Sequence, residues 1–367
     1  MENDTVFVGL DVHKETIAVA VAETGRAAPR FIGTCGPSTG ELLKVLSHLG
    51  QPGNTLLAYE SGPGGFALAR DLARRGWRCQ VVAVSKTPRR SGKQIKTDRR
   101  DALMLASYLR SAELTPVVVP DERDEAIRDL SRAREDAVRA RAKARQQLKA
   151  MLLRHGKSYS GKTSWGTTHE KYLCRIVFEH PAQQIAWAEY RSAVLEAGER
   201  VERITAALRE QVASWRYAEV VKALMCFKGI DFVAAVSVVA ELGDLHRFEH
   251  PKQLMAYLGL VPSEYSSGNS RSQGGITKAG NGHVRRMLVE AAWSYRHSAR
   301  MSRPVTERQA GQPRVVRDIA WRAQLRLCGR YRRLSARGVH QNKICVAVAR
   351  ELCGFLWEAG RQVQPRG

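Results

Sequence analysis

The sequence predicts an α/β domain followed by two mainly helical regions, and three observations support that prediction. Short strand-like runs alternate with helical runs up to about residue 120. From residue 121 to 217, charged residues are mixed with small apolar residues at three- and four-residue steps, as in long helices. Beyond residue 218, helical patterns prevail and basic residues are frequent. We therefore expect domains at residues 1–120, 121–217 and 218–367.

The first domain begins with three strand-like runs. They are TVFVGLDVH, TIAVAVAE and residues 30–34. After them we expect a helix at residues 39–49, a buried strand at NTLLAYE, a helix after Pro63, a strand at RCQVVAV and a helix at residues 98–110. Three strands, then helix, strand, helix, strand and helix is the order of elements in an RNase H-like α/β fold.

The middle region predicts two long helices. One covers residues 121–154 and the other runs from about Pro181 to Trp215, with HGKSYSGKTSWGTTH between them. Their apolar spacing favours an antiparallel coiled-coil hairpin. Ordinary packed helices of a globular bundle are the alternative.

The last region begins with ALMCFKGIDFVAAVSVVAEL, which predicts a helix-hairpin-helix. Backbone N–H groups of its KGID turn, together with Lys228, are candidates for binding a phosphate. A plain pair of helices without a ligand is the alternative. We then expect a Ser/Gly-rich loop at PSEYSSGNSRSQGG, a helix starting near Lys278, and two basic helices at residues 314–333 and 340–357.

The charge indicates a polyanionic partner. The chain has 59 Lys and Arg against 36 Asp and Glu, a formal net charge of +23, and such a field attracts nucleic acid. The seven cysteines are scattered without metal-ligand spacing, which favours reduced thiols over a disulfide framework. No signal-like segment or membrane-length apolar run is present, so we expect a cytoplasmic protein and no membrane partner.

Four acidic residues lie at the ends of predicted elements. Asp11 ends the first strand, Glu60 ends a buried strand, and Asp98 and Asp101 begin a helix, on which a spacing of three residues puts them on one side. If these elements meet, their oxygens form a cluster that suits Mg²⁺ and phosphodiester chemistry. The alternatives are an N-cap for Asp98, ion pairing with neighbouring basic residues for Asp101, and plain surface exposure for Glu60.

GLDVHKETIAVAV, the Glu60 segment and KTDRRDALMLA resemble the three motifs of the DEDD transposases, recombinases of the insertion-sequence 110 type. The resemblance implies a RuvC-like N-terminal domain with Asp11, Glu60, Asp98 and Asp101 as Mg²⁺ ligands. CFKGIDFVAAVSVVAELGD, HPKQLMAYLGLVPSEYSSG and ITKAGNGHVRRMLVEAAW resemble the same family's C-terminal transposase domain. There the resemblance implies that Ser267 is the nucleophile that joins DNA covalently, and the adjacent Ser266 stays open as an alternative.

The resemblance also implies partners. They are donor and target DNA, a structured non-coding bridge RNA, and further copies of the chain in a dimer or tetramer. The basic residues that we expect to contact nucleic acid are Lys96, Arg99, Arg100, Lys228, Lys278, Arg285 and Arg286.

Two other functions remain open at this point. A metal-dependent endonuclease or junction resolvase would use water with the acidic cluster alone and would not need Ser267. A non-catalytic nucleic-acid-binding protein would use the acids only as helix caps and ion-pair partners.

Overall fold

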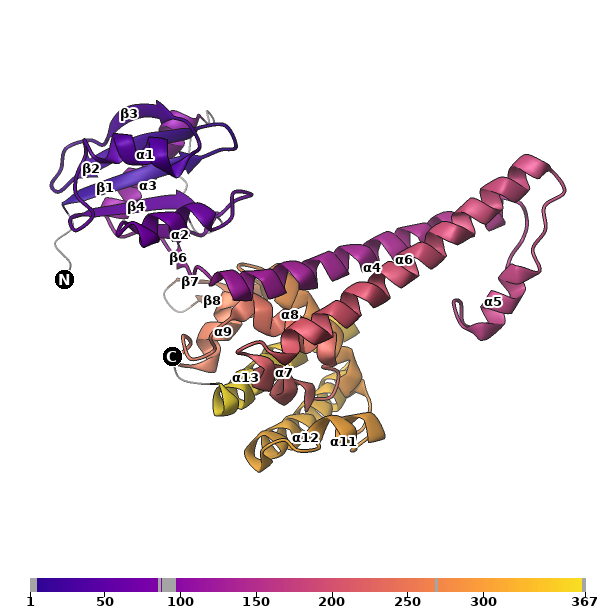
Figure 1. Cartoon of the computed structure of the whole chain (residues 1–367). Helices are drawn as coiled ribbons and strands as arrows, with labels where there is room; N and C mark the ends of the chain where they lie inside the picture. Colours follow the sequence, from indigo (N-terminus) through magenta and orange to yellow (C-terminus); the bar gives the residue numbers. More distant parts are fainter. Residues whose placement is uncertain (1–4, 85–86, 88–96, 268–269, 365–367) are drawn as a thin grey trace. The chain divides into compact units, whose positions relative to one another are not determined.

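A computed structural model describes residues 5–84, 87, 97–267 and 270–364, and it divides the chain into two compact units, Met1–Asp121 and Glu122–Gly367 (Figure 1). The strands are β1 (Val6–Val12), β2 (Ile17–Glu23), β3 (Arg30–Cys35), β4 (Thr55–Glu60), β5 (Arg78–Val82), β6 (Pro116–Val117), β7 (Pro262–Ser267) and β8 (Ser270–Ile276). The helices of the first unit are α1 (Thr39–Leu46), α2 (Ala67–Arg74) and α3 (Asp98–Arg110). Those of the second are α4 (Glu122–Arg154), α5 (Thr167–Cys174), α6 (Pro181–Ala213), α7 (Ala218–Met225), α8 (Phe232–Leu242), α9 (Pro251–Tyr257), α10 (Gly282–Ala292), the 3₁₀ helix η2 (Trp293–Arg296), α11 (Arg303–Gln309), α12 (Arg314–Ala336) and α13 (Gln341–Val363).

The first unit contains a mixed sheet of six strands in the order β3-β2-β1-β4-β5-β6. The first three strands pair antiparallel, whereas β4 pairs parallel with both β1 and β5. Parallel neighbours end at the same edge of a sheet, so the carboxyl ends of β1 and β4 lie side by side. The α/β prediction for this region is confirmed.

The two faces of this sheet are chemically different, and β2 shows the difference most clearly. Its side chains alternate, so that Ile17, Val19 and Val21 pack into the core that includes residues of α1 and α2. Its small residues Ala18, Ala20 and Ala22 pack on the other face against alanines of α3. Small side chains on this face let α3 lie close to the sheet.

Gly9 in β1 allows the closest approach of that helix. A Cβ atom at this position would lie 2.3 Å from the carbonyl oxygen of Ala102 and 2.4 Å from the backbone nitrogen of Ala106. Since real Cβ atoms do not approach backbone atoms so closely, only glycine fits here. This contact fixes α3 across β1.

Helices α4 and α6 form the predicted hairpin (Figure 1). Their buried residues repeat every seven positions. Buried residues at this spacing are Ala137, Ala144 and Met151 on α4, and Trp187, Val194, Val201 and Leu208 on α6. A seven-residue repeat of buried positions is typical of a coiled coil.

The base of the hairpin belongs to a larger helical core. Ile127, Leu208 and Val212 pack in the same cluster as residues of α7, α8, α10, α12 and α13. Residues 122–367 thus form one compact unit, and the further division at residues 217 and 218 stays a prediction. In the described part of the chain, no helix has the length and apolar character needed to cross a membrane.

Two local predictions for the last region were inaccurate. The expected Ser/Gly-rich loop contains the antiparallel hairpin of β7 and β8, which has polar side chains on both faces and therefore lacks the apolar alternation that reveals a strand. The helix expected near Lys278 begins instead at Gly282, where the Asn281 side chain accepts the backbone N–H of Val284. Helices α5, α9 and α11 were not predicted either, since eight or fewer residues give little periodicity.

Candidate functional site

Asp11 and Glu60 lie at equivalent positions of two adjacent parallel strands. Leu10 of β1 and Tyr59 of β4 form the last residue pair between these strands, and Asp11 and Glu60 come directly after them. One pair earlier, Gly9 lies opposite Ala58, and both of those residues face α3. Because side chains alternate along a strand, Asp11 and Glu60 also belong to the face that α3 covers.

The first turn of α3 carries Asp98 and Asp101. Its N-cap is Thr97, whose hydroxyl oxygen accepts the backbone N–H of Arg100 at 3.4 Å. The alternative that Asp98 serves as the N-cap is therefore wrong. Asp98 is a helical residue whose carboxylate is available for another interaction.

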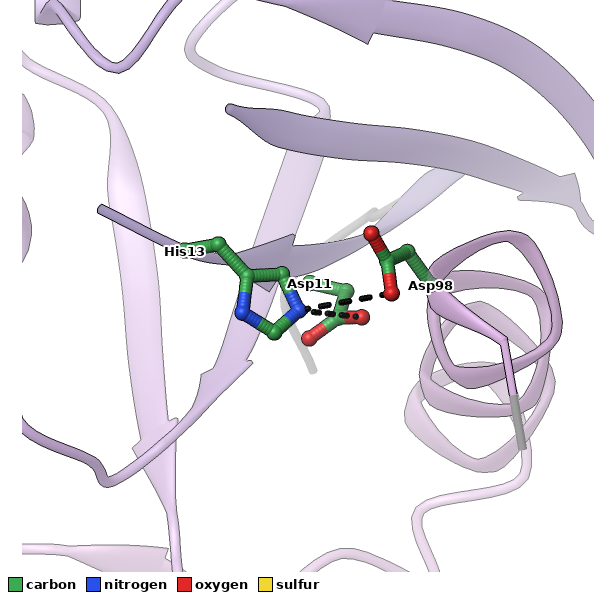
Figure 2. Close-up of side chains that lie close together, drawn as sticks. All are labelled: Asp11, His13 and Asp98. Atoms are coloured by element: carbon green, nitrogen blue, oxygen red, sulfur yellow. Dashed lines mark hydrogen bonds and ion pairs between the residues drawn. The ribbon is translucent and has the colours of Figure 1, made fainter. Parts of the chain in front are cut away.

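Three side chains converge where β1 ends and α3 begins (Figure 2). The His13 Nε2 atom lies 3.2 Å from Asp11 Oδ2 and 3.5 Å from Asp98 Oδ1. One potential ligand atom from each of the three residues lies within 4.8 Å of the others, and no second group of this kind occurs among the described residues. Asp11 is 19% exposed, whereas His13 and Asp98 are 51% and 61% exposed. The cluster is therefore open to solvent at His13 and Asp98 and largely buried at Asp11.

The pKa of the Asp11 carboxyl is raised, and the largest cause is burial. His13 opposes this shift by its charge and its hydrogen bond, whereas the carboxylates of Asp101 and Asp98 raise the pKa further. A carboxyl surrounded in this way gains from a nearby cation, which stabilises its ionised form.

The four predicted acids differ in how closely the structure associates them with the cluster. Asp11 and Asp98 share the cluster, and Asp101 is close enough to act on the charge of Asp11. Glu60 shares the face and the sheet edge but is not one of the three clustered residues.

The sequence analysis missed His13. The signal that could have found it is its position two residues after Asp11 in GLDVHKE, since residues at that spacing in an extended chain point to the same side.

The donor set fits a divalent cation. Carboxylate oxygens are the ligands that Mg²⁺ and Mn²⁺ prefer, and an imidazole nitrogen is better suited to Mn²⁺ than to Mg²⁺. Asp11 and Asp98 would hold such an ion with His13 beside them, and Asp101 lies near enough to add charge. Glu60 shares the sheet edge with Asp11 and stays a predicted ligand.

Ser266 and Ser267 lie on opposite faces of the β7–β8 hairpin. Ser267 is the last residue of β7 and is opposite Ser270, and both Ser266 and Ser267 are exposed. The Ser266 hydroxyl donates to Glu264 Oε1 at 2.9 Å. Within the described part of the chain, the Ser267 hydroxyl has no hydrogen-bond partner. Residues 268 and 269, which follow it, lie outside that part.

The basic residues near α3 differ in their surroundings. Arg99 and Arg100 are exposed, and the Arg99 guanidinium lies over the Phe31 ring at 5.4 Å from its centre. Lys96 was also predicted to contact nucleic acid and lies outside the described residues.

The basic residues of the second unit already contact protein groups. The Lys228 ammonium donates to the Ser298 carbonyl at 3.0 Å, and the Arg285 guanidinium donates to the carbonyls of Leu258 and Ala279 at 2.8 and 2.9 Å. Arg286 pairs with Glu135 and with Glu290. These three residues contribute to local structure, and their contact with nucleic acid stays a prediction.

Lys278 is exposed and has a left-handed backbone with φ of 56°. Its own contact with nucleic acid also stays a prediction.

Comparison with known proteins defines the class as transposases of insertion sequences. The chain is 45% identical over 360 residues to the putative transposase y4qE of Sinorhizobium fredii, covering 98% of this chain and 89% of that one. It is 30% identical over 333 residues to the transposase for insertion sequence element IS1533 of Leptospira borgpetersenii, covering 90% and 96%. A third relative is the transposase for insertion sequence element IS1328 of Yersinia enterocolitica, 28% identical over 243 residues, or 65% of this chain and 70% of the relative.

Two family models match different parts of the chain. Residues 8–156 match the DEDD transposase model of the IS110 type, and residues 221–306 match the model described as transposase IS116/IS110/IS902 family. The chain belongs to the IS116/IS110/IS902 family of transposases. It is an enzyme that acts on DNA.

Proposed function

We propose that this transposase cuts and rejoins DNA through a covalent serine–DNA intermediate, with Ser267 as the nucleophile. Mg²⁺ would be bound by Asp11, Glu60, Asp98 and Asp101. The observation that carries the metal site is the convergence of Asp11, at the carboxyl end of β1, with the acids of the first turn of α3. Glu60 at the carboxyl end of the adjacent strand β4 supports it. The strand order supports an RNase H-like and RuvC-like assignment: β3, β2 and β1 pair antiparallel in turn, and the parallel strands β4 and β5 lie on the other side of β1, followed by the short antiparallel β6.

Two arguments favour Ser267 over Ser266. The Ser266 hydroxyl is occupied by Glu264, and that carboxylate would repel an approaching phosphodiester. The Ser267 hydroxyl has no hydrogen-bond partner within the described part of the chain, so it is available to attack. It lies on the other face of the hairpin, together with the exposed Tyr265 and away from Glu264.

The chemistry of the proposed step is a transesterification. The Ser267 oxygen forms a bond to phosphorus, the bond from phosphorus to a sugar oxygen breaks, and that oxygen takes up the serine proton. A hydroxyl of another strand then attacks the same phosphorus, the bond between phosphorus and the Ser267 oxygen breaks, and the serine takes up the proton of that hydroxyl. A bound divalent cation would supply stabilisation of the charge on the phosphate oxygens and the leaving oxygen.

The proposal includes several partners. They are donor DNA, target DNA, a structured non-coding bridge RNA that pairs with both, and further copies of the chain in a dimer or tetramer, with the hairpin of α4 and α6 as an interface. The net charge of +23 supports binding of more than one nucleic acid strand. We place the protein in the bacterial cytoplasm, associated with the nucleoid when bound to DNA.

A suicide-substrate assay tests the proposal. The full chain is incubated with Mg²⁺, the RNA flanking the element, and DNA that is nicked so that the cleaved strand cannot rejoin. We expect a covalent protein–DNA adduct that disappears in Ser267→Ala, persists in Ser266→Ala, and is absent in Asp11→Asn and Asp101→Asn.

Each alternative predicts a different result. A water-dependent endonuclease or junction resolvase would cleave without an adduct and would retain cleavage in Ser267→Ala. If the chain is a non-catalytic nucleic-acid-binding protein, the Asp11→Asn variant would bind DNA as well as the unmodified protein does, and neither would cleave it. An adduct that persists in Ser267→Ala would refute the assignment of the nucleophile.

A further inference from the structure

A cavity of about 290 Å³ lies on the hairpin, between α4 and the segment that precedes α5. Arg141, Arg145 and Lys149 line it from α4, and Trp165 lines it from the segment. The three basic residues are four positions apart, so they follow one face of the helix at intervals of about 6 Å. The volume is near the lower limit for small-molecule sites, a size that suits one nucleotide rather than a folded element.

Trp165 has an unusual backbone conformation and several side-chain contacts at this cavity. Its backbone φ is 69°, a left-handed conformation that is unusual for a bulky residue and costs energy. One side of the indole is near the ring of His169, which is 2% exposed, with ring centres 4.9 Å apart. The Arg145 guanidinium lies 4.6 Å from the indole centre and the Lys149 ammonium lies 5.7 Å away. Strained backbone that surrounding contacts hold in place is common at binding sites.

The charges around the cavity are unbalanced. The pKa of the Arg145 guanidinium is lowered, first by burial and then by repulsion from Arg141, and the carboxylate of Glu170 only partly opposes this. Lys149 donates to the neutral hydroxyl of Ser164 at 3.0 Å. From residue 155 to 169, the segment contains Lys157 and Lys162 but no Asp or Glu. The site therefore repels cations and would be stabilised by an anion between Arg141 and Lys149.

We propose that this cavity binds an unstacked nucleotide of a single-stranded polynucleotide, with the base beside the stacked side chains of Trp165 and Arg145 and with neighbouring phosphates on Arg141 and Lys149. An aromatic ring next to a row of cations is the combination that binds single strands without sequence preference. A base within a duplex cannot enter such a cavity unless it leaves the stack. The geometry and charge would serve RNA and DNA alike, and the test distinguishes these two sources.

Photo-cross-linking tests the proposal directly. The full chain is mixed with 12-nucleotide oligo(U) or oligo(dT), each containing one 5-iodo base, and irradiated in EDTA. The cross-linked residue is identified by mass spectrometry. Because no metal is present and nothing is cleaved, the result does not depend on the Mg²⁺ ligands or on Ser267. We expect the label on Trp165 and competition by unlabelled single strands but not by a duplex of equal length.

Two substitutions test the role of the cations against a matched control. Arg141→Ala and Lys149→Ala should each lower the Trp165 cross-link yield and the affinity for the single strand about 5- to 10-fold, as expected for lost phosphate contacts. Lys143→Ala removes the same charge from an exposed position of α4 outside the cavity and should change both by less than about 2-fold. Circular dichroism checks that each variant is folded.

Every outcome is decisive. A Trp165 label with oligo(U) alone assigns RNA, a label with oligo(dT) alone assigns DNA, and equal labelling assigns a site that does not discriminate between the sugars. The proposal is overturned if neither strand labels Trp165, or if Lys143→Ala causes the same loss as Lys149→Ala.

Discussion

At the scale of the residue, His13 shows how a side chain outside the four-acid pattern becomes part of the candidate site. Its imidazole contacts both Asp11 and Asp98. A residue that contacts both helps to set the spacing available to a cation.

We predict that His13→Ala weakens binding of Mn²⁺ about 10-fold and binding of Mg²⁺ less, because an imidazole nitrogen contributes more to the transition metal. Isothermal titration calorimetry with each metal measures the two affinities. His48→Ala removes an exposed histidine of the same unit and should change neither. If His13→Ala binds each metal with the same affinity as the unmodified protein does, His13 is excluded as a ligand.

At the scale of the element, the approach of α3 to β1 brings the acids of the helix to the acid of the strand. Gly9 and the alanines of β2 make this approach possible, and the Thr97 cap determines where the first turn starts. A bulkier residue at position 9 would push the helix away from the strand and Asp98 away from Asp11.

We expect Gly9→Ala to destabilise the first unit by about 2 to 3 kcal/mol, because the new Cβ would collide with backbone atoms of α3 that cannot rotate away. The gain of up to about 1 kcal/mol that alanine usually brings to a strand is smaller than this cost. Thermal unfolding followed by circular dichroism measures the change. Gly53→Ala is the control, since a Cβ there would meet no atom within 4 Å.

At the scale of the whole molecule, many acids are used inside the second unit. Glu241 is 3% exposed and accepts two hydrogen bonds from Arg132, at 2.7 and 3.0 Å, and one from Asn281 at 2.7 Å. Glu135 similarly pairs with His283 and Arg286. These contacts join α4 to the C-terminal helices.

Glu241→Gln should destabilise the second unit by about 2 kcal/mol at neutral pH, since a buried charged hydrogen-bond network loses its acceptor charge. Burial raises the pKa of the Glu241 carboxyl, but hydrogen bonds and charge from Arg132, and then Asn281 and His283, outweigh it and lower the pKa below its usual value of 4.5. A carboxyl with a lowered pKa stabilises the fold above its unfolded pKa and loses this effect as pH falls through the folded pKa.

The difference between Glu241→Gln and the unmodified protein should therefore be largest at pH 7 and shrink as pH drops below about 4.5. Urea denaturation at a series of pH values measures it. Glu219→Gln breaks an exposed pair with Lys222 and should cost about 0.5 kcal/mol or less at every pH. A constant difference across the pH range would contradict the role assigned to Glu241.

How much of the fold could be predicted depended on how local the determining interactions are. Helix α3 begins and ends at the predicted residues because its cap and its periodicity lie within the segment. The β7–β8 hairpin could not be recognised, since its strands are held by cross-strand backbone pairing and have no apolar face. In the candidate site, the four acids were predicted from strand ends and helix spacing, and the structure brings Asp11 and Asp98 together, whereas the part of His13 required knowledge of which elements meet.

The sequence by itself determined the order of the elements from β1 to α3, the hairpin helices, the basic charge and the acids proposed as metal ligands, because these depend on composition and on contacts between near neighbours in the chain. Only the tertiary structure decided that His13 joins Asp11 and Asp98 in one cluster, and that Ser266 and Ser267 lie on opposite faces of one hairpin. It also revealed the cationic cavity at Trp165. The physical reason is that strand pairing and helix packing bring together residues far apart in the chain, and no local pattern encodes those distances.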